Sequence, residues 1–214
     1  MPAKEHPMQA LSGYLPDGSF EKVVQYLHHY KVHLTITRQR KSVLGDYRHA
    51  GGWGRNHQIS INGNLNKFEF LITLLHELAH LLTFELHKNK VEPHGKEWKT
   101  QFRHILIPFM GKRFFPGDVE KALYAYLHNP AASTCTDAHL YKALYRYDEH
   151  KPGFKLVDEL DINQYFETED GQVYQKLEKL RTRTRCKNLN SGKVYFFQGI
   201  VEVKAIRKKY TVDA

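Results

Sequence analysis

The chain has 214 residues, of which 41% are hydrophobic and 13% aromatic. That composition supplies one sizeable core and excludes an intrinsically disordered or collagen-like chain. A mean hydropathy of -0.58 and the lack of any long uncharged apolar run exclude a membrane span. Two cysteines, Cys135 and Cys186, are too few for a disulfide framework or a four-cysteine zinc site. The N-terminal segment does not resemble a signal peptide, so we expect a cytoplasmic protein with no membrane partner.

Charge is distributed unevenly along the chain. The formal net charge is +9, yet residues 1–170 carry 21 basic and 20 acidic side chains, whereas residues 171–214 carry 11 and 3. All 14 histidines lie at or before His150. The histidine-rich front and the basic tail therefore indicate two parts with different roles.

The first predicted elements are a helix and three strands. Apolar residues at helical spacing predict a helix over 20–30, and alternating apolar residues predict strands over 32–37, 41–47 and 57–61. We interpret His57, Ile59 and Ile61 as an edge strand that holds an extended peptide by backbone pairing. A purely structural strand is the alternative.

A long helix follows, beginning after Asn66 and ending near His87. Asn66 is a favourable N-cap, and Glu69 three positions later completes a capping box. The helix is apolar nearly all round, so we expect it to be buried. Three further helices are predicted: one with Trp98 on its apolar face that ends at Pro108, and two over 118–128 and 137–148.

Pro152 and Gly153 mark a predicted domain boundary. Beyond them the pattern changes to short strand-like runs, over 155–157, 172–174, 194–197 and 200–206. The predicted fold class is therefore α+β. Residues 1–150 form a domain of helices around a small sheet, and residues 151–214 form a basic, β-rich domain.

His76, Glu77 and His80 form an H-E-x-x-H motif on the long helix. Positions i and i+4 share one helix face, so the two imidazoles can ligate one zinc ion while Glu77 reaches a water beside it. Burying three ionisable side chains without partners costs on the order of several kcal/mol, which a metal site avoids. The alternative is a hydrogen-bonded pair of core histidines with a surface glutamate.

A catalytic zinc site needs a third protein ligand and an open fourth position. His94 is the favoured candidate, because it lies between Pro93 and Gly95 at the start of the next predicted helix. A helix N-terminus disfavours the imidazolium form and keeps the nitrogen lone pair free. Glu97, as a carboxylate ligand of the thermolysin type, is the alternative.

The HELAH sequence, a short loop and then His94–Lys99 (HGKEWK) together resemble the SprT-like zinc metallopeptidase family, whose eukaryotic members include Spartan. The resemblance covers about residues 20–110 and pairs H-E-x-x-H with H-G-x-x-W. It implies a minimal zincin fold, in which a small sheet backs the active-site helix, and cleavage of proteins, notably proteins crosslinked to DNA. It also implies zinc ligation by His76, His80 and His94, with Glu77 as the catalytic acid and base.

The chain departs from the family pattern after this segment. Many members carry a C-terminal zinc ribbon with paired cysteines, whereas this sequence contains no C-x-x-C. We therefore expect neither a second zinc ion nor DNA binding through such a ribbon.

The predicted reaction is hydrolysis of a peptide bond by a zinc-activated water, with Glu77 passing the proton to the leaving amine. Tyr47, Arg48 and His49 are candidates for the oxyanion donor, and a solvated turn with a packed tyrosine is the alternative. Two other functions stay open. One is a nucleic-acid-binding protein with a structural or gated zinc site, and the other is a zinc hydrolase that acts on something other than protein.

The tail carries a run of alternating basic residues, namely Arg181, Arg183, Arg185 and Lys187. In a strand they would form one basic stripe, and nearby aromatic residues are interleaved with it. This pattern predicts a DNA-binding surface. The alternative is the solvated face of a small β-barrel whose aromatic residues form the core.

Overall fold

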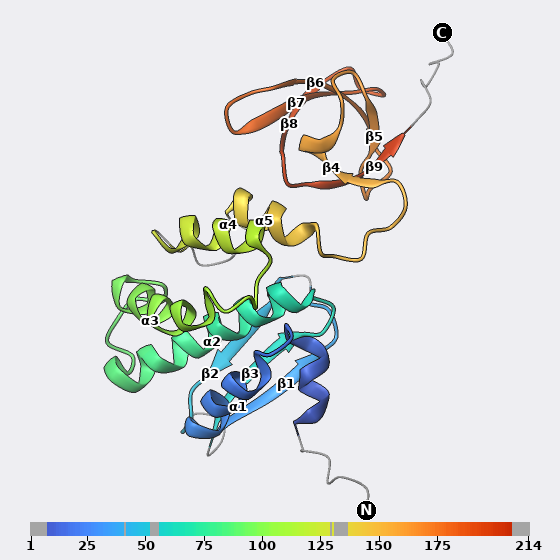
Figure 1. Cartoon of the computed structure of the whole chain (residues 1–214). Coiled ribbons are helices and arrows are strands. Elements are labelled where there is room, and N and C mark those ends of the chain that lie inside the picture. Colours follow the sequence, from blue (N-terminus) through green and yellow to red (C-terminus); the bar gives the residue numbers. More distant parts are fainter. Residues whose placement is uncertain (1–7, 41, 52–55, 129, 131–136, 207–214) are drawn as a thin grey trace, which may run out of the picture. The chain divides into compact units, whose positions relative to one another are not determined.

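The structure is a computed structural model that describes residues 8–40, 42–51, 56–128, 130 and 137–206. The chain divides into two compact units, Met1–Asp148 and Glu149–Ala214 (Figure 1). Within the described ranges, no helix has the length and apolarity needed to cross a membrane. Cys135, and Lys41 at the start of the second predicted strand, lie outside the described residues.

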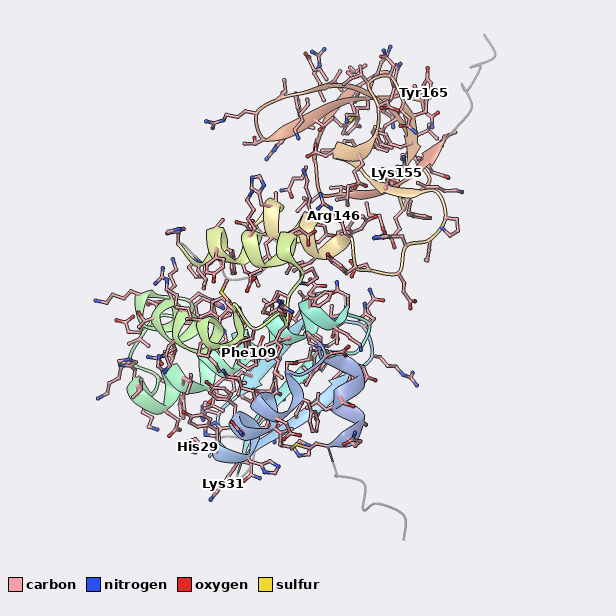
Figure 2. All side chains as sticks on the ribbon, in the orientation of Figure 1. His29, Lys31, Phe109, Arg146, Lys155 and Tyr165 are labelled. Atoms are coloured by element: carbon pink, nitrogen blue, oxygen red, sulfur yellow. The ribbon has the colours of Figure 1, made fainter. Side chains whose placement is uncertain are left out.

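The first unit contains a small mixed sheet, whose strands are β1 (Val32–Thr37), β2 (Gly45–Arg48) and β3 (His57–Asn62). The strand order is β1-β3-β2, with β3 parallel to β1 and antiparallel to β2. Helix α1 (Phe20–His29) leads into β1, and Figure 2 labels His29 at the end of this helix.

The expectation that His57, Ile59 and Ile61 form an edge strand is wrong. β3 is the central strand, and Ile59 pairs with a residue of β1 on one side and a residue of β2 on the other. Its backbone groups are therefore already used within the sheet. Ile59 and Ile61 are also buried in the core, at 1% and 0% exposure, so neither side chain can reach a peptide.

Helix α2 (Lys67–His87) is the central element of this unit. Asn66 caps it as predicted, because its side chain accepts hydrogen bonds from the backbone N–H groups of Phe68 (3.1 Å) and Glu69 (3.0 Å). Most of the helix is buried, which explains why apolar residues occupy nearly every face.

The three further predicted helices are present within a few residues of their expected bounds, as α3 (Lys96–Leu106), α4 (Gly117–Leu127) and α5 (Ala138–Tyr145). Two short 3-10 helices, η1 (Gln9–Tyr14) and η2 (Ile107–Phe109), were not predicted. Helix α3 packs on α2, and its Trp98 and Phe102 are fully buried. Phe109, labelled in Figure 2, extends this core beyond the end of α3.

The second unit is a curved antiparallel sheet that forms a half-barrel (Figure 1). Its strands are β4 (Phe154–Leu156), β5 (Tyr165–Glu167), β6 (Val173–Lys179), β7 (Arg183–Asn188), β8 (Val194–Gln198) and β9 (Glu202–Ile206), with η4 (Val157–Glu159) after β4. The order is β4-β9-β5-β6-β7-β8, so β4 and β8 lie at its two ends. A separate core is centred on Phe166, Tyr174, Cys186 and Val203. The whole chain is therefore α+β, as predicted.

Candidate metal centre

Three histidine side chains converge on one point in the first unit. His76 and His80 lie one turn apart on α2, and His94 approaches from the loop before α3. The Nε2 atoms are 3.2 Å apart for His76–His80, 3.1 Å for His76–His94 and 3.0 Å for His80–His94. The three histidines form a group that could hold a metal ion.

The triangle of nitrogens fits a cation better than it fits hydrogen bonding. Bonds of about 2.05 Å at tetrahedral angles place the nitrogens around a zinc ion about 3.3 Å apart, close to the three distances in the structure. Without a cation, each neutral Nε2 is either a donor or an acceptor, so at least two of the three are alike and cannot pair. An ion that accepts all three lone pairs removes this conflict.

His94 adopts a left-handed backbone conformation, with φ of 60°. This conformation costs a residue with a side chain about 1 kcal/mol or more, and it turns the chain just before Gly95, the N-cap of α3. The N–H of Gly95 donates to the carbonyl of Glu92 at 3.0 Å and closes the turn. Glu97, the alternative third ligand, is not part of the group, and its carboxylate lies 3.7 Å from the Lys96 ammonium.

The ring of Trp98 packs against all three imidazoles. Its ring centroid lies 4.6 Å from that of His76, 5.4 Å from that of His80 and 4.7 Å from that of His94. Trp98 is fully buried and stacks on Phe102 at 5.1 Å with an interplanar angle of 8°. Both aromatic residues belong to α3, so the packing of α3 on α2 fixes the orientation of the imidazole rings.

Burial keeps the three imidazoles neutral. It lowers the pKa of His76 to about 2 and the pKa of His80 to about 4, and neighbouring imidazoles act in the same direction. Burial also lowers the pKa of His94. A neutral imidazole carries the free lone pair that a metal ion needs, so at pH 7 these side chains are ready to bind one.

Glu77 lies between α2 and the β2 strand, with 6% of its surface exposed. A Cβ atom at Gly45 would lie 2.5 Å from Oε1 of Glu77, so the backbone of β2 passes directly over the carboxylate. Burial raises the pKa of Glu77 to about 8, with the Asp46 carboxylate acting in the same direction and the Arg40 guanidinium against it. Gly45 was not singled out from the sequence, although a glycine inside a predicted strand is a signal of close backbone approach.

Asn62 anchors the segment that carries Gly45. Its side-chain amide donates to the carbonyls of Arg40 (3.1 Å) and Val43 (2.9 Å), and its Oδ1 accepts from Nε of Arg40 at 2.8 Å. Nη1 of Arg40 also donates to Oγ of Ser60 at 3.0 Å. Asn62 is 1% exposed, so this network fixes the start of β2 from inside the protein.

A cavity of about 330 Å³ lies beside the metal centre. His80 and Trp98 form part of its wall, and so do all three candidate oxyanion donors, Tyr47, Arg48 and His49. A cavity of this size is at the lower end of the range found for ligand sites. The structure therefore brings the candidate donors to a space that also borders a metal ligand.

His57 does not line the cavity, but it contacts Tyr47, which does. Its Nδ1 lies 2.9 Å from Oη of Tyr47, and its Nε2 lies 3.4 Å from Oε1 of Glu85. Because an ionised carboxylate only accepts, neutral His57 carries its proton on Nε2, and Tyr47 donates to Nδ1. Burial raises the pKa of Tyr47, which keeps the phenol protonated.

The four basic residues predicted to bind nucleic acid belong to the second unit. Arg183, Arg185 and Lys187 lie on β7, and Arg181 lies in the turn before it.

The fold and the site define a class of protein: an α+β protein with a buried H-E-x-x-H helix, whose two histidines and a third from the next loop form a potential metal site. The model of the SprT-like family matches residues 18–111. That segment, which contains all three histidines and Glu77, therefore matches the SprT-like family, as the motifs predicted.

Two curated relatives are similar to part of this segment. The chain is 34% identical over 88 residues to Protein SprT of Klebsiella pneumoniae strain 342, covering 37% of this chain and 52% of the relative. It is 41% identical over 58 residues to Protein SprT of Klebsiella pneumoniae subsp. pneumoniae, covering 25% of this chain and 34% of the relative. The chain thus spans about half the length of the first relative and about a third of the length of the second. No solved structure matches it significantly.

Proposed function

We propose that the first unit is a zinc-dependent endopeptidase with a minimal zincin fold. The observation that carries this proposal is the convergence of three neutral imidazole nitrogens next to a buried glutamate. Imidazole nitrogens suit zinc, and three protein ligands is the number typical of catalytic zinc sites. Bound zinc polarises a carbonyl group and lowers the pKa of water to about 7.

The chain's own residues supply the proton transfers. A cation held by the three histidines would favour the ionised form of Glu77. The carboxylate then accepts a proton from the attacking water and delivers it to the nitrogen of the leaving amine. The position of Glu77 one residue after His76 places it at the metal centre without making it a ligand. The backbone of β2 at Gly45 lies close against the carboxylate and limits its movement, so the base is positioned before substrate arrives.

β2 is the strand that suits an extended peptide. It lies at the end of the sheet order and pairs with β3 alone in the described sheet, so its other edge offers free backbone groups. Because Gly45 on this strand lies over Glu77, a peptide paired to this edge runs past the general base. The cavity lined by Tyr47 and His80 then receives one side chain of the substrate.

The family resemblance supports proteins associated with or crosslinked to DNA as the substrate class. Two alternatives differ in what they predict. A structural zinc site predicts metal binding without hydrolysis, and a different hydrolase predicts turnover of a small ester or amide but not of protein.

Glu77→Gln tests the proposal, with Glu21→Gln, an exposed residue on α1, as the matched control. We expect one zinc ion per chain in all three proteins by metal analysis. Cleavage of labelled casein and of a DNA-bound protein should fall at least about 100-fold in Glu77→Gln only. Cleavage that survives in purified Glu77→Gln would contradict the proposed role of Glu77. Zinc binding by the wild type with no cleavage of any protein would contradict the peptidase.

A further inference from the structure

The basic charge of the second unit is concentrated on three consecutive strands. Residues 173–198, from the start of β6 to the end of β8, contain seven basic side chains and one acidic side chain. Residues 149–172 contain two basic and seven acidic side chains. One half of this small unit is therefore positive and the other negative, which gives it a polarised surface.

The side chains of β7 alternate between the core and the outer face. Thr184, Cys186 and Asn188 are buried, whereas Arg183 and Lys187 are exposed and Arg185 is half-buried. The buried set fixes the orientation of the strand, because a shift by one residue would place the basic side chains in the core. The outer face of β7 is thus uniformly basic.

The pairing register places apolar residues of β8 beside these cations. Arg185 pairs with Phe196, and Lys187 pairs with Val194. Directly paired residues project to the same face of a sheet, so Phe196 lies on the same outer face as Arg185. Phe196 is 53% exposed, although its neighbour Phe197 packs into the core.

Two of the three cations on β7 have no acidic partner among the residues that the structure describes. Arg185 forms an ion pair with Glu178 at 2.6 Å, and Glu178 is the one acidic residue of this segment. Arg183 and Lys187 form no ion pair with any described residue. Their charges are therefore available to an anion from outside the chain.

We propose that the outer face of β7 and β8 binds single-stranded nucleic acid. Arg183 and Lys187 contact phosphates, and Arg185 exchanges its exposed ion pair with Glu178 for the phosphate between them. The ring of Phe196 stacks on an unpaired base. This function is independent of the metal centre and goes beyond the proposed hydrolysis.

The geometry favours a single strand over a duplex. Alternate residues of a strand are about 6.6 Å apart, so the three cations form a straight row along β7. Phe196 projects from the outer face of β8 and is 53% exposed, so its ring is accessible to a base. Aromatic stacking requires an exposed base face, which a paired duplex does not offer. Charge alone would attract either form, so Phe196 is the discriminating feature.

Binding can be measured with the full chain by fluorescence anisotropy, using a labelled oligo(dT) of about 20 nucleotides, the matching RNA and a duplex. With three phosphate contacts, the logarithm of the affinity should fall with the logarithm of salt concentration at a slope of about -2. Phe196→Ala should weaken binding of the single strand about tenfold and leave duplex binding unchanged. The double variant Arg183→Glu/Lys187→Glu should weaken binding at least about tenfold and flatten the salt slope.

Lys155→Glu is the control for a charge reversal outside the proposed surface, since Lys155 is exposed on β4 at the opposite end of the sheet order (Figure 2). It should keep wild-type affinity, and circular dichroism should show that all variants are folded. The proposal is overturned if the wild type binds no single strand at low salt. It is also overturned if Phe196→Ala binds as tightly as the wild type, or if Lys155→Glu weakens binding as much as the double variant.

Discussion

A single methyl group at Gly45 should separate catalysis from metal binding. The added Cβ would lie 2.5 Å from Oε1 of Glu77 and 2.9 Å from Cγ2 of Thr73, whereas ordinary contacts begin at 3.4 Å. The carboxylate oxygen must therefore retreat by about 0.9 Å. Glu77 and Thr73 are 6% and 5% exposed, so neither side chain can swing into solvent to make room.

The magnitude follows from these distances. A misplacement of about 1 Å at a reacting group costs about 100-fold in rate, so we expect kcat/KM of Gly45→Ala to fall by about that factor. Overpacking a buried contact costs about 1–3 kcal/mol of stability, so the Tm should also fall. The three histidines are positioned by contacts with Trp98 and with one another, so zinc affinity should change little.

Gly13→Ala provides the control, because a Cβ at Gly13 meets nothing within 4 Å. The assay compares kcat/KM on labelled casein, zinc stoichiometry and Tm for the two variants and the wild type. Gly13→Ala should match the wild type in all three. If Gly45→Ala binds zinc and retains kcat/KM within about threefold of the wild type, then β2 does not position the general base and the reasoning is refuted.

Three further predictions concern stability. Zinc at about 100 times its Kd should stabilise the wild type by about 2.7 kcal/mol in thermal melts, and His94→Ala should lose that effect. Burial beside Asp148 raises the pKa of Glu69 to about 7 from 4.5, so the folded state binds the proton more tightly than the unfolded chain. Stability therefore falls as pH rises from about 4.5 to 7, and urea unfolding at pH 8 should show Glu69→Gln more stable by up to about 3 kcal/mol. Lys176 donates to three backbone carbonyls at 2.6–3.3 Å, so Lys176→Met should destabilise the second unit by about 3 kcal/mol in hydrogen exchange, while the control Lys155→Met should not.

Much of the metal centre could be predicted because the residues that form it lie close together in the sequence. The spacing of His76 and His80 specifies a shared helix face wherever a helix forms, and Asn66 marks where that helix begins. His94 follows closely in the chain and precedes a second strong helix pattern. Short-range patterns of this kind determine helices and caps before any tertiary contact is considered.

The order of the strands could not be predicted in the same way. β3 alternates as an edge strand would, yet it pairs with β1 and β2 on both sides, since strand pairing depends on residues far away in the chain. The role of Gly45 also depends on pairing, because only the position of β2 over α2 brings it to Glu77. In the second unit β5 (Tyr165–Glu167) was missed, because its place between β9 and β6 depends on pairing with strands that follow it in the chain.

His76 and His80 are positioned more rigidly than His94, whose position depends on the packing of α3. Metal binding is therefore linked to that packing. His76 and His80 stand on a 21-residue buried helix, whereas His94 stands on a strained left-handed residue that is stabilised by the burial of Trp98 and Phe102 behind it. A cation that binds all three imidazoles offsets the backbone strain of His94 and accepts the lone pairs of three nitrogens that cannot all pair with one another. By linkage, any change that loosens the Trp98–Phe102 stack weakens metal affinity by the same factor by which the metal stabilises the packing of α3.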